Sequence, residues 1–313
     1  MSAAVSQKGE EATPLLIPEL MARVRQIQLR THRLVSTALS GGYRSTFRGQ
    51  GVEFSEVRPY QPGDDVRSID WNVTARTGEP FIKRYAEERE LTVHLIVDTS
   101  SSMDFGSRRW TKREAAAQLA ALIAFVAMQH QDRVGLTLFG AEPGLHLPAR
   151  KGSKHVLRIV REVIAAQPSG PGSDFETVLQ HELRTFHRRG MLFLISDFLA
   201  EDAGEEWVDV LARLALRHDV IAIRVVDPLE EDLPAAGLVR LVEIESGVAL
   251  ELDSRSKTVR EIWRARARGR RARLVDRLAR ARVELIDLPV ERDLADPLVA
   301  FFRRRSLRHG GAR

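Results

Sequence analysis

The stretch that most constrains the fold is residues 94–105, HLIVDTSSSMDF, in which an apolar run ends in an aspartate followed by hydroxyl side chains. The apolar run, residues 91–97, is typical of a strand that is buried on both faces of a parallel sheet. Asp98 then lies at the carboxyl end of that strand. Because ligands of open α/β sheets bind outside the carboxyl ends of the strands, we expect Asp98 to face such a crevice.

Two other stretches predict partners for Asp98. Residues 190–198, GMLFLISDF, form a second apolar run that ends in Asp197, and residues 170–179, GPGSDFETVL, place Ser173 after a glycine-rich turn. Hydroxyl and carboxylate oxygens that meet at one point suit Mg²⁺ or Mn²⁺. The predicted metal ligands are Asp98, Ser100, Ser102, Ser173 and Asp197.

The order of these motifs resembles the metal-ion-dependent adhesion site of von Willebrand factor A domains. Asp98, Ser100 and Ser102 match its D-x-S-x-S motif, Asp197 matches its closing aspartate, and Ser173 stands where these domains most often have threonine. Serine keeps the oxygen ligand but lacks a methyl group that helps to fix the rotamer, so a weaker or looser site is expected. The alternative for D-x-S-x-S alone is a turn or helix cap. The resemblance implies a Rossmann-like α/β fold, a mostly parallel sheet flanked by helices.

Residues 41–98 carry a denser set of motifs. A glycine-rich start precedes E-F, then R-x-Y-x-P-G-D-D-x-R-x-I-D-W, A-R, a basic residue and paired acids. The pattern resembles family 58 of the bacterial domains of unknown function. Proteins of this type commonly occur with MoxR-type AAA+ ATPases, so the resemblance implies such a partner. The matching residues are Glu53, Phe54, Arg58, Tyr60, Pro62, Gly63, Asp64, Asp65, Arg67, Ile69, Asp70, Trp71, Ala75, Arg76, Lys83, Glu87 and Glu88.

The residues of this block favour a structural role. Pro62 and the glycine after it indicate a turn, and arginines alternate with acids around Tyr60 and Trp71. Such a pattern more often builds a polar network than an active site. Because its large apolar side chains need a surface to bury against, we expect residues 1–90, a tail, an amphipathic helix and this block, to pack on a von Willebrand factor A-like domain of residues 91–313.

The rest of the chain alternates between helical and strand patterns, the signature of a parallel α/β sheet. One predicted helix is rich in arginine, and a solvated basic face, or one that meets an acidic partner, is favoured there over nucleic-acid binding. Helices are expected at residues 15–39, 113–130, 154–166, 175–186, 205–216, 259–282 (the arginine-rich one) and 294–304, strands at 134–139, 145–150, 191–195, 220–226 and 283–288, and an inserted β-hairpin within 238–252.

The composition limits the domain sizes, the cellular compartment and the kinds of partner that we expect. The 313 residues, 43% of them hydrophobic, allow one large domain with an appendage or two modest domains. Cysteine is absent, and we find no signal pattern and no apolar stretch long enough to span a bilayer, so a cytoplasmic protein is expected. A net charge of +5 is far below the basic excess of a dedicated nucleic-acid binder.

Enzymatic motifs are missing from the sequence, which has no G-x-x-x-x-G-K-[ST] loop and no G-x-S-x-G elbow. His181 and Glu182 suggest a zinc-binding helix, but threonine lies four residues after His181, and His187 falls on the wrong helical face. A phosphohydrolase could use Asp98, yet Ser100 stands where D-x-D enzymes have their second acid. We therefore expect a non-catalytic, Mg²⁺-dependent adaptor that binds a protein carboxylate. The alternatives are that phosphohydrolase and a basic nucleic-acid or membrane-surface binder.

Overall fold

The computed structural model describes residues 52–61, 64–65, 69–87, 90–108, 110–168, 170, 172–199, 204–242, 249–291 and 293–310. The expected N-terminal tail and the helix at residues 15–39 lie outside this range. The same holds for part of the family-specific block, namely Pro62, Gly63, Arg67 and Glu88 and the side chains of Glu53, Phe54, Lys83 and Glu87.

A six-stranded sheet forms the centre of the molecule. Its order is β10-β7-β6-β3-β4-β5, and neighbouring strands run parallel except for β5, which is antiparallel to β4. The strands are β3 (Thr92–Asp98), β4 (Arg133–Phe139), β5 (Pro143–Arg150), β6 (Met191–Ser196), β7 (Asp219–Val226) and β10 (Glu284–Pro289). This architecture confirms the predicted mostly parallel α/β fold.

The strand order fixes where a ligand can bind. Counted along the chain, the six strands of this sheet follow the doubly wound order 3-2-1-4-5-6, which reverses between β3 and β6. The connections from these two strands leave toward opposite faces, and ligands of open α/β sheets bind at the carboxyl ends of such a pair of strands. Asp98 is the last residue of β3, and Asp197 directly follows β6. The two predicted acids therefore flank the switch point of the sheet.

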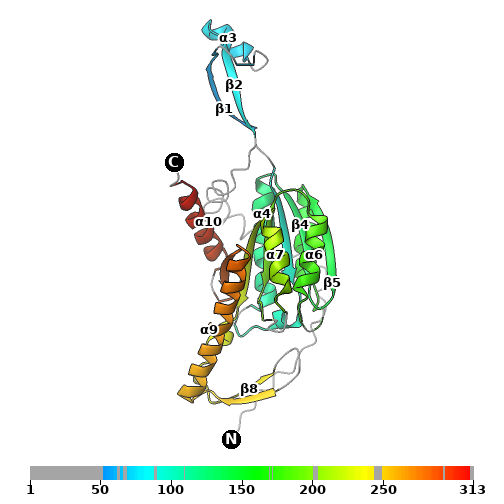
Figure 1. Cartoon of the computed structure of the whole chain (residues 1–313), viewed down its shortest axis with the longest axis vertical. Coiled ribbons are helices and arrows are strands. Elements are labelled where there is room, and N and C mark those ends of the chain that lie inside the picture. Colours follow the sequence, from blue (N-terminus) through cyan, green and yellow to red (C-terminus); the bar gives the residue numbers. More distant parts are fainter. Residues whose placement is uncertain are drawn as a thin grey trace.

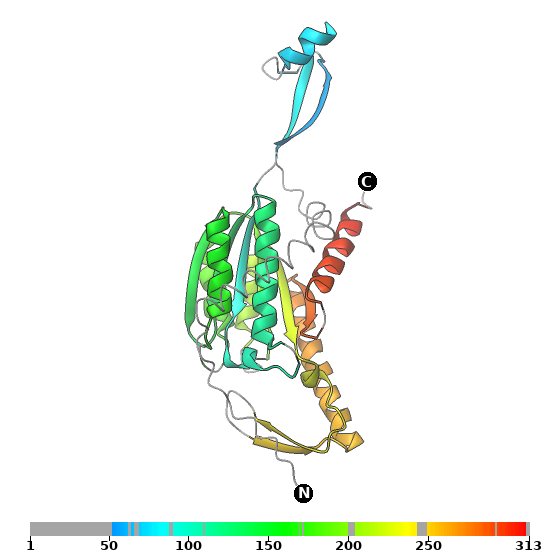
Figure 2. The same cartoon turned by 180° about the vertical axis from the view of Figure 1, so that it is seen from behind.

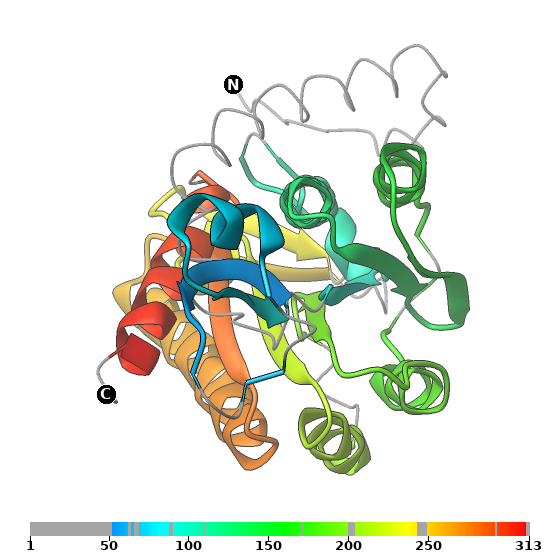
Figure 3. The same cartoon turned by 90° about the horizontal axis from the view of Figure 1, so that it is seen from above.

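Helices cover both faces of the sheet (Figures 1 and 3). Buried side chains of α4 (Lys112–Gln129), α5 (Ser153–Ala165) and α10 (Ala295–Gly310) share one apolar cluster with one face of β3. Those of α6 (Phe175–Thr185), α7 (Glu206–Ala215) and α9 (Lys257–Arg280) share the cluster on the other face. The six helices predicted after residue 112 are therefore present, with ends that differ by one or two residues, except that α10 continues to Gly310.

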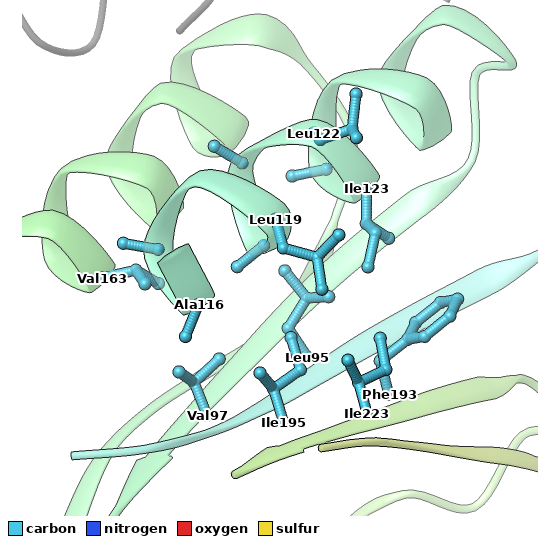
Figure 4. Close-up of a cluster of buried hydrophobic side chains, with 14 of the residues drawn as sticks. Leu95, Val97, Ala116, Leu119, Leu122, Ile123, Val163, Phe193, Ile195 and Ile223 are labelled. Atoms are coloured by element: carbon cyan, nitrogen blue, oxygen red, sulfur yellow. The ribbon is translucent and has the colours of Figure 1, made fainter. Parts of the chain in front are cut away.

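The core on the α4 face explains why α4 is apolar on nearly all sides. Leu95 and Val97 of β3 point toward α4, and Leu119 and Ile123 of α4 lie over them (Figure 4). α5 lies beside α4 on the same face of the sheet, and its Val163 belongs to the same cluster (Figure 4). Contacts with the sheet and with the neighbouring helix bury α4 on more than one side, and its small alanines let these elements approach closely.

The family-specific block forms a unit of its own. β1 (Val52–Pro59) pairs with β2 (Phe81–Glu87) in an antiparallel hairpin, and α3 (Trp71–Thr77), which the sequence patterns did not indicate, lies between them in the chain. Figures 1 and 2 show this unit beyond the amino ends of the sheet strands. The predicted packing of residues 1–90 on the core stays a prediction.

Side chains of this unit agree with the expected polar network at one point and differ from the expected burial at another. The guanidinium group of Arg58 pairs with Asp64 at 2.7 Å, and the same carboxylate accepts the backbone N–H of Gln61 at 2.9 Å. Trp71, expected to bury against a surface, is 68% exposed. The polar contacts that the structure describes thus stabilise a local turn.

A second hairpin lies at the opposite end of the molecule, as expected for residues 238–252. β7 leads into α8 (Pro228–Glu231) and then into β8 (Leu238–Val242) and β9 (Ala249–Asp253), which pair in antiparallel fashion. Figures 1 and 2 place this hairpin beyond the carboxyl ends of the sheet strands. Its side chains of Leu238, Val242 and Leu250 are exposed. None of the described helices is both long enough and apolar enough to cross a bilayer.

Candidate functional site

Asp98 is the centre of a cluster of serine hydroxyls. Its side chain is fully buried, and its Oδ1 accepts the backbone N–H of Ser100 at 2.8 Å. Its Oδ2 accepts the hydroxyls of Ser173 at 2.8 Å and Ser196 at 2.5 Å. The hydroxyls of Ser100 and Ser102 lie 3.1 Å apart. The structure thus brings together four of the five residues that the sequence predicts as ligands.

Glycines place the loop that carries Ser173. The short 3-10 helix after β3, η3 (Ser101–Asp104), donates the backbone N–H of Ser101 to the carbonyl oxygen of Gly170 at 3.0 Å. Gly170 and Gly172 have φ of 97° and 82°, a left-handed conformation that side-chain-bearing residues rarely adopt. Asp174 then caps α6. The predicted glycine turn and helix start therefore hold Ser173 against the end of β3.

Asp197, the fifth predicted ligand, is already paired with a cation. Its Oδ1 accepts the backbone N–H of Leu199 at 3.0 Å, and its Oδ2 accepts the ammonium group of Lys112 at 2.6 Å. Lys112 is the first residue of α4, is fully buried, and also donates to Glu230 at 2.5 Å. The positive end of the helix dipole disfavours a cation there, so the two carboxylates offset that cost. Asp197 thus belongs to a buried ion network beside Asp98.

The charges in this network shift the protonation of its members. Burial raises the pKa of Asp98 to about 6, with a further contribution from the negative charge of Asp197. Burial also raises the pKa of Glu230. Burial works against the charged form of Lys112, but the two adjacent carboxylates outweigh it and raise its pKa. Asp98 therefore takes up a proton near pH 6, whereas Lys112 stays charged.

The donor set fits a hard divalent cation. The carboxylate of Asp98 gathers with the hydroxyl oxygens of four serines, all hard ligands, at the end of β3. Ser102 and Ser173 are only half-buried, which leaves a side open to solvent. The ammonium group of Lys112 repels a second cation. The three carboxylates of the network outnumber it, so the edge keeps a negative charge.

Sequence reasoning missed Ser196, Lys112 and Glu230. Ser196 directly precedes the predicted Asp197 at a strand end, and that position was a signal that could have identified it. A lysine at a helix start is normally solvated, and an acid in a short helix commonly serves as a cap, so Lys112 and Glu230 carry no comparable signal.

The doubly wound sheet, with D-x-S-x-S at the end of its first strand and an acid after its fourth, defines a von Willebrand factor A-like domain. The chain belongs to DUF58, a family of proteins of unknown function, whose family model matches residues 56–273.

Related proteins leave the function open. The uncharacterized protein Rv1480 of Mycobacterium tuberculosis is 34% identical over 290 residues, which cover 92% of this chain and 90% of that protein. Among solved structures, BatB from Bacteroides thetaiotaomicron is 13% identical, with a TM-score of 0.44 and coverage of 70% of this chain and 99% of BatB. The SpRpn10 VWA domain is 13% identical, with a TM-score of 0.41 and coverage of 67% and 94%. Function therefore has to be inferred from this chain's own residues.

Proposed function

We propose that this protein is a non-catalytic, cytoplasmic adaptor that binds a carboxylate of another protein through Mg²⁺ or Mn²⁺ at the end of β3. The observation that carries the proposal is the convergence of Ser100, Ser173 and Ser196 on the carboxylate of Asp98. Such a cluster costs free energy without a cation because it buries a charge, and a divalent ion would remove that cost.

Each residue of the cluster would contribute to ion binding in a different way. Asp98 supplies the charge, and the hydroxyls of Ser100, Ser102 and Ser173 supply neutral oxygens. When bound, the ion supplies an open coordination position that accepts an oxygen of the partner. Asp197 would contact the ion through a water molecule and not directly, because its Oδ2 already accepts a hydrogen bond from Lys112. The same pairing leaves Lys112 unavailable for acid–base work, in keeping with a binding role.

A MoxR-type AAA+ ATPase, or a client of one, is the partner we propose, on the basis of the family resemblance. Two features of the chain suit such a partner. The hairpin β8–β9 exposes Leu238, Val242 and Leu250 at the same end of the molecule as the Asp98 cluster (Figures 1 and 2). Helix α9 carries many exposed arginines, which would steer an acidic partner and speed its association at low salt.

The protein should bind Mn²⁺ weakly, with a dissociation constant of roughly 0.1–1 mM, because neutral hydroxyls contribute little charge to the site. Calorimetry should detect this binding in the unaltered protein and find none in a double variant, Asp98→Ala with Ser100→Ala. Ser153→Ala, at an exposed helix start, is the matched control and should bind normally. Equal binding by the double variant would show that the ion sits elsewhere.

Capture of partners from a lysate of the native host should depend on the metal. We expect recovery of an AAA+ ATPase or its client with Mg²⁺, and loss of that protein both with EDTA and with the Asp98→Ala variant. The reason is that the partner's carboxylate and Asp98 would share the ion. Recovery that neither EDTA nor Asp98→Ala reduces would show that the Asp98 cluster does not make the contact.

A further inference from the structure

A second cluster of metal-ligating side chains lies on the α6 face of the sheet. His94 of β3, His146 of β5 and Glu182 of α6 each offer one ligand atom, and these atoms all lie within 4.8 Å of one another. Nε2 of His94 is 3.4 Å, and Nδ1 of His146 is 3.9 Å, from Oε1 of Glu182. β3 and β5, the strands on either side of β4, and the covering helix α6 thus bring three residues to one point across 88 positions of sequence.

The buried carboxylate of Glu182 is the feature of this cluster that most favours binding of a cation. Its side chain is fully buried, and its Oε2 has no hydrogen-bond partner among the described residues. Its Oε1 accepts the hydroxyl of Thr137 at 2.6 Å, and its ion-pair partners in the described structure are the two histidines. A buried carboxylate with one free oxygen costs several kcal/mol unless a positive charge offsets it.

We propose that His94, His146 and Glu182 form a binding site for a transition-metal ion of the Zn²⁺ type. Imidazole nitrogens favour Zn²⁺ over Mg²⁺, and two histidines with one carboxylate are a common three-ligand zinc set. The fourth position falls to the hydroxyl of Thr137 or to a water molecule. The Thr137 Oγ1 lies 2.9 Å from both ring nitrogens, so it must move aside slightly or join the ligands when the ion binds.

The surroundings of the cluster provide both room and access. A Cβ atom on residue 135 would lie 2.3 Å from Nδ1 of His94, so Gly135 leaves the space that the ring needs. His146 lies on the edge strand β5, and its side chain is 29% exposed, which gives an ion a path inward. The ring of His181 packs against that of His146 at 4.7 Å, and its Nε2 has no hydrogen-bond partner among the residues that the structure describes.

This site is separate from the Asp98 cluster. His94 and Asp98 are four residues apart on the same face of β3, which places them about 13 Å from each other along the strand. The two sites also differ in chemistry, because nitrogen ligands define one and oxygen ligands the other. The competing explanation for the cluster is a hydrogen-bond network centred on Thr137, with Glu182 paired to a protonated histidine.

Metal titration of the full-length protein distinguishes these explanations. In excess Mg²⁺, the protein should bind about one equivalent of Zn²⁺, and Co²⁺ should give the visible absorption of a four-coordinate site with nitrogen ligands. Glu182→Gln and His146→Gln should each weaken Zn²⁺ binding by more than about tenfold, since loss of even an outer-shell partner costs that much. His146 is partly exposed, so its variant should fold even if Glu182→Gln does not.

Two control variants complete the experiment. His187→Gln removes an exposed histidine just past the end of α6, and Asp98→Ala removes the other candidate site; neither should change Zn²⁺ affinity or the Co²⁺ spectrum. If no saturable Zn²⁺ binding is seen, or if His146→Gln binds as tightly as His187→Gln, the metal site does not exist and the cluster is the Thr137 hydrogen-bond network.

Discussion

Replacing Lys112 by methionine should lower the free energy of unfolding by about 3–5 kcal/mol at neutral pH, the cost of leaving buried charges without their partner. The substitution keeps most of the buried volume but removes the one ammonium group that Asp197 and Glu230 share. Urea denaturation at pH 7 measures the loss. Lys151→Met is the matched control, because Lys151 pairs with Glu90 at the surface, where such a pair contributes at most about 1 kcal/mol.

The pH dependence of the Lys112→Met variant gives an independent check. Burial already raises the pKa of Glu230, and loss of the ammonium group should raise it further. A carboxyl group whose pKa is higher in the folded state binds more protons when folded, so acidification favours folding. The variant should therefore regain stability, relative to the unaltered protein, as the pH falls from 7 toward 5. Equal losses for Lys112→Met and Lys151→Met would contradict the buried network.

Replacing Asp98 by asparagine should stabilise the metal-free protein above pH 6, by up to about 3 kcal/mol, while abolishing its response to Mn²⁺. The pKa of Asp98 is raised from 3.8 to about 6 in the folded state, and each pKa unit corresponds to about 1.4 kcal/mol. An asparagine NH₂ group in place of Oδ2 can donate to both Ser173 and Ser196, whose hydroxyls then accept. The buried charge disappears, but the hydrogen bonds can remain.

The sign of the pH effect follows from proton counting. Between about pH 4 and pH 6 the folded state holds a proton on Asp98 that the unfolded state has released, so stability falls as the pH rises through this window. Denaturation in EDTA should show this fall in the unaltered protein and a flatter profile in Asp98→Asn. Asp209→Asn, at an exposed position in α7, should keep the fall. A profile unchanged by Asp98→Asn would mean that another group causes it.

The parts of the fold that could be predicted are those in which burial dictates the residue type. Strands β3 and β6 are buried on both faces, so each is a largely apolar run in the sequence. The end of each run can be recognised in the sequence, and this identifies Asp98 and Asp197 as acids at the carboxyl ends of the strands. The glycine turn before α6 was predictable because left-handed conformations demand glycine. The same reasoning fails for Trp71, which is exposed, because the presence of an aromatic residue does not by itself mean that the residue is buried.

The parts that could not be predicted are those assembled from distant positions. Lys112 meets Asp197 and Glu230 across 85 and 118 positions of sequence, and no local pattern of charge indicates that pairing. Linear zinc motifs require both histidines on one helix, so they reject Glu182, although two strands supply its histidines in the folded protein. Spacing rules apply within an element, whereas these sites form between elements.

The ammonium group of Lys112 connects the sheet edge to α8, the short helix that precedes the β8–β9 hairpin. Glu230 belongs to α8, which leads into β8, and the indole N–H of Trp263 in α9 donates to the carbonyl oxygen of Leu229 in α8 at 2.9 Å. A ligand that draws Asp197 away from Lys112 would leave Glu230 as the one carboxylate, among the described residues, that pairs with that ammonium group. We therefore expect a ligand at the edge to change the free energy of α8 and its contacts, and by reciprocity a protein that binds the β8–β9 hairpin to alter affinity at the edge.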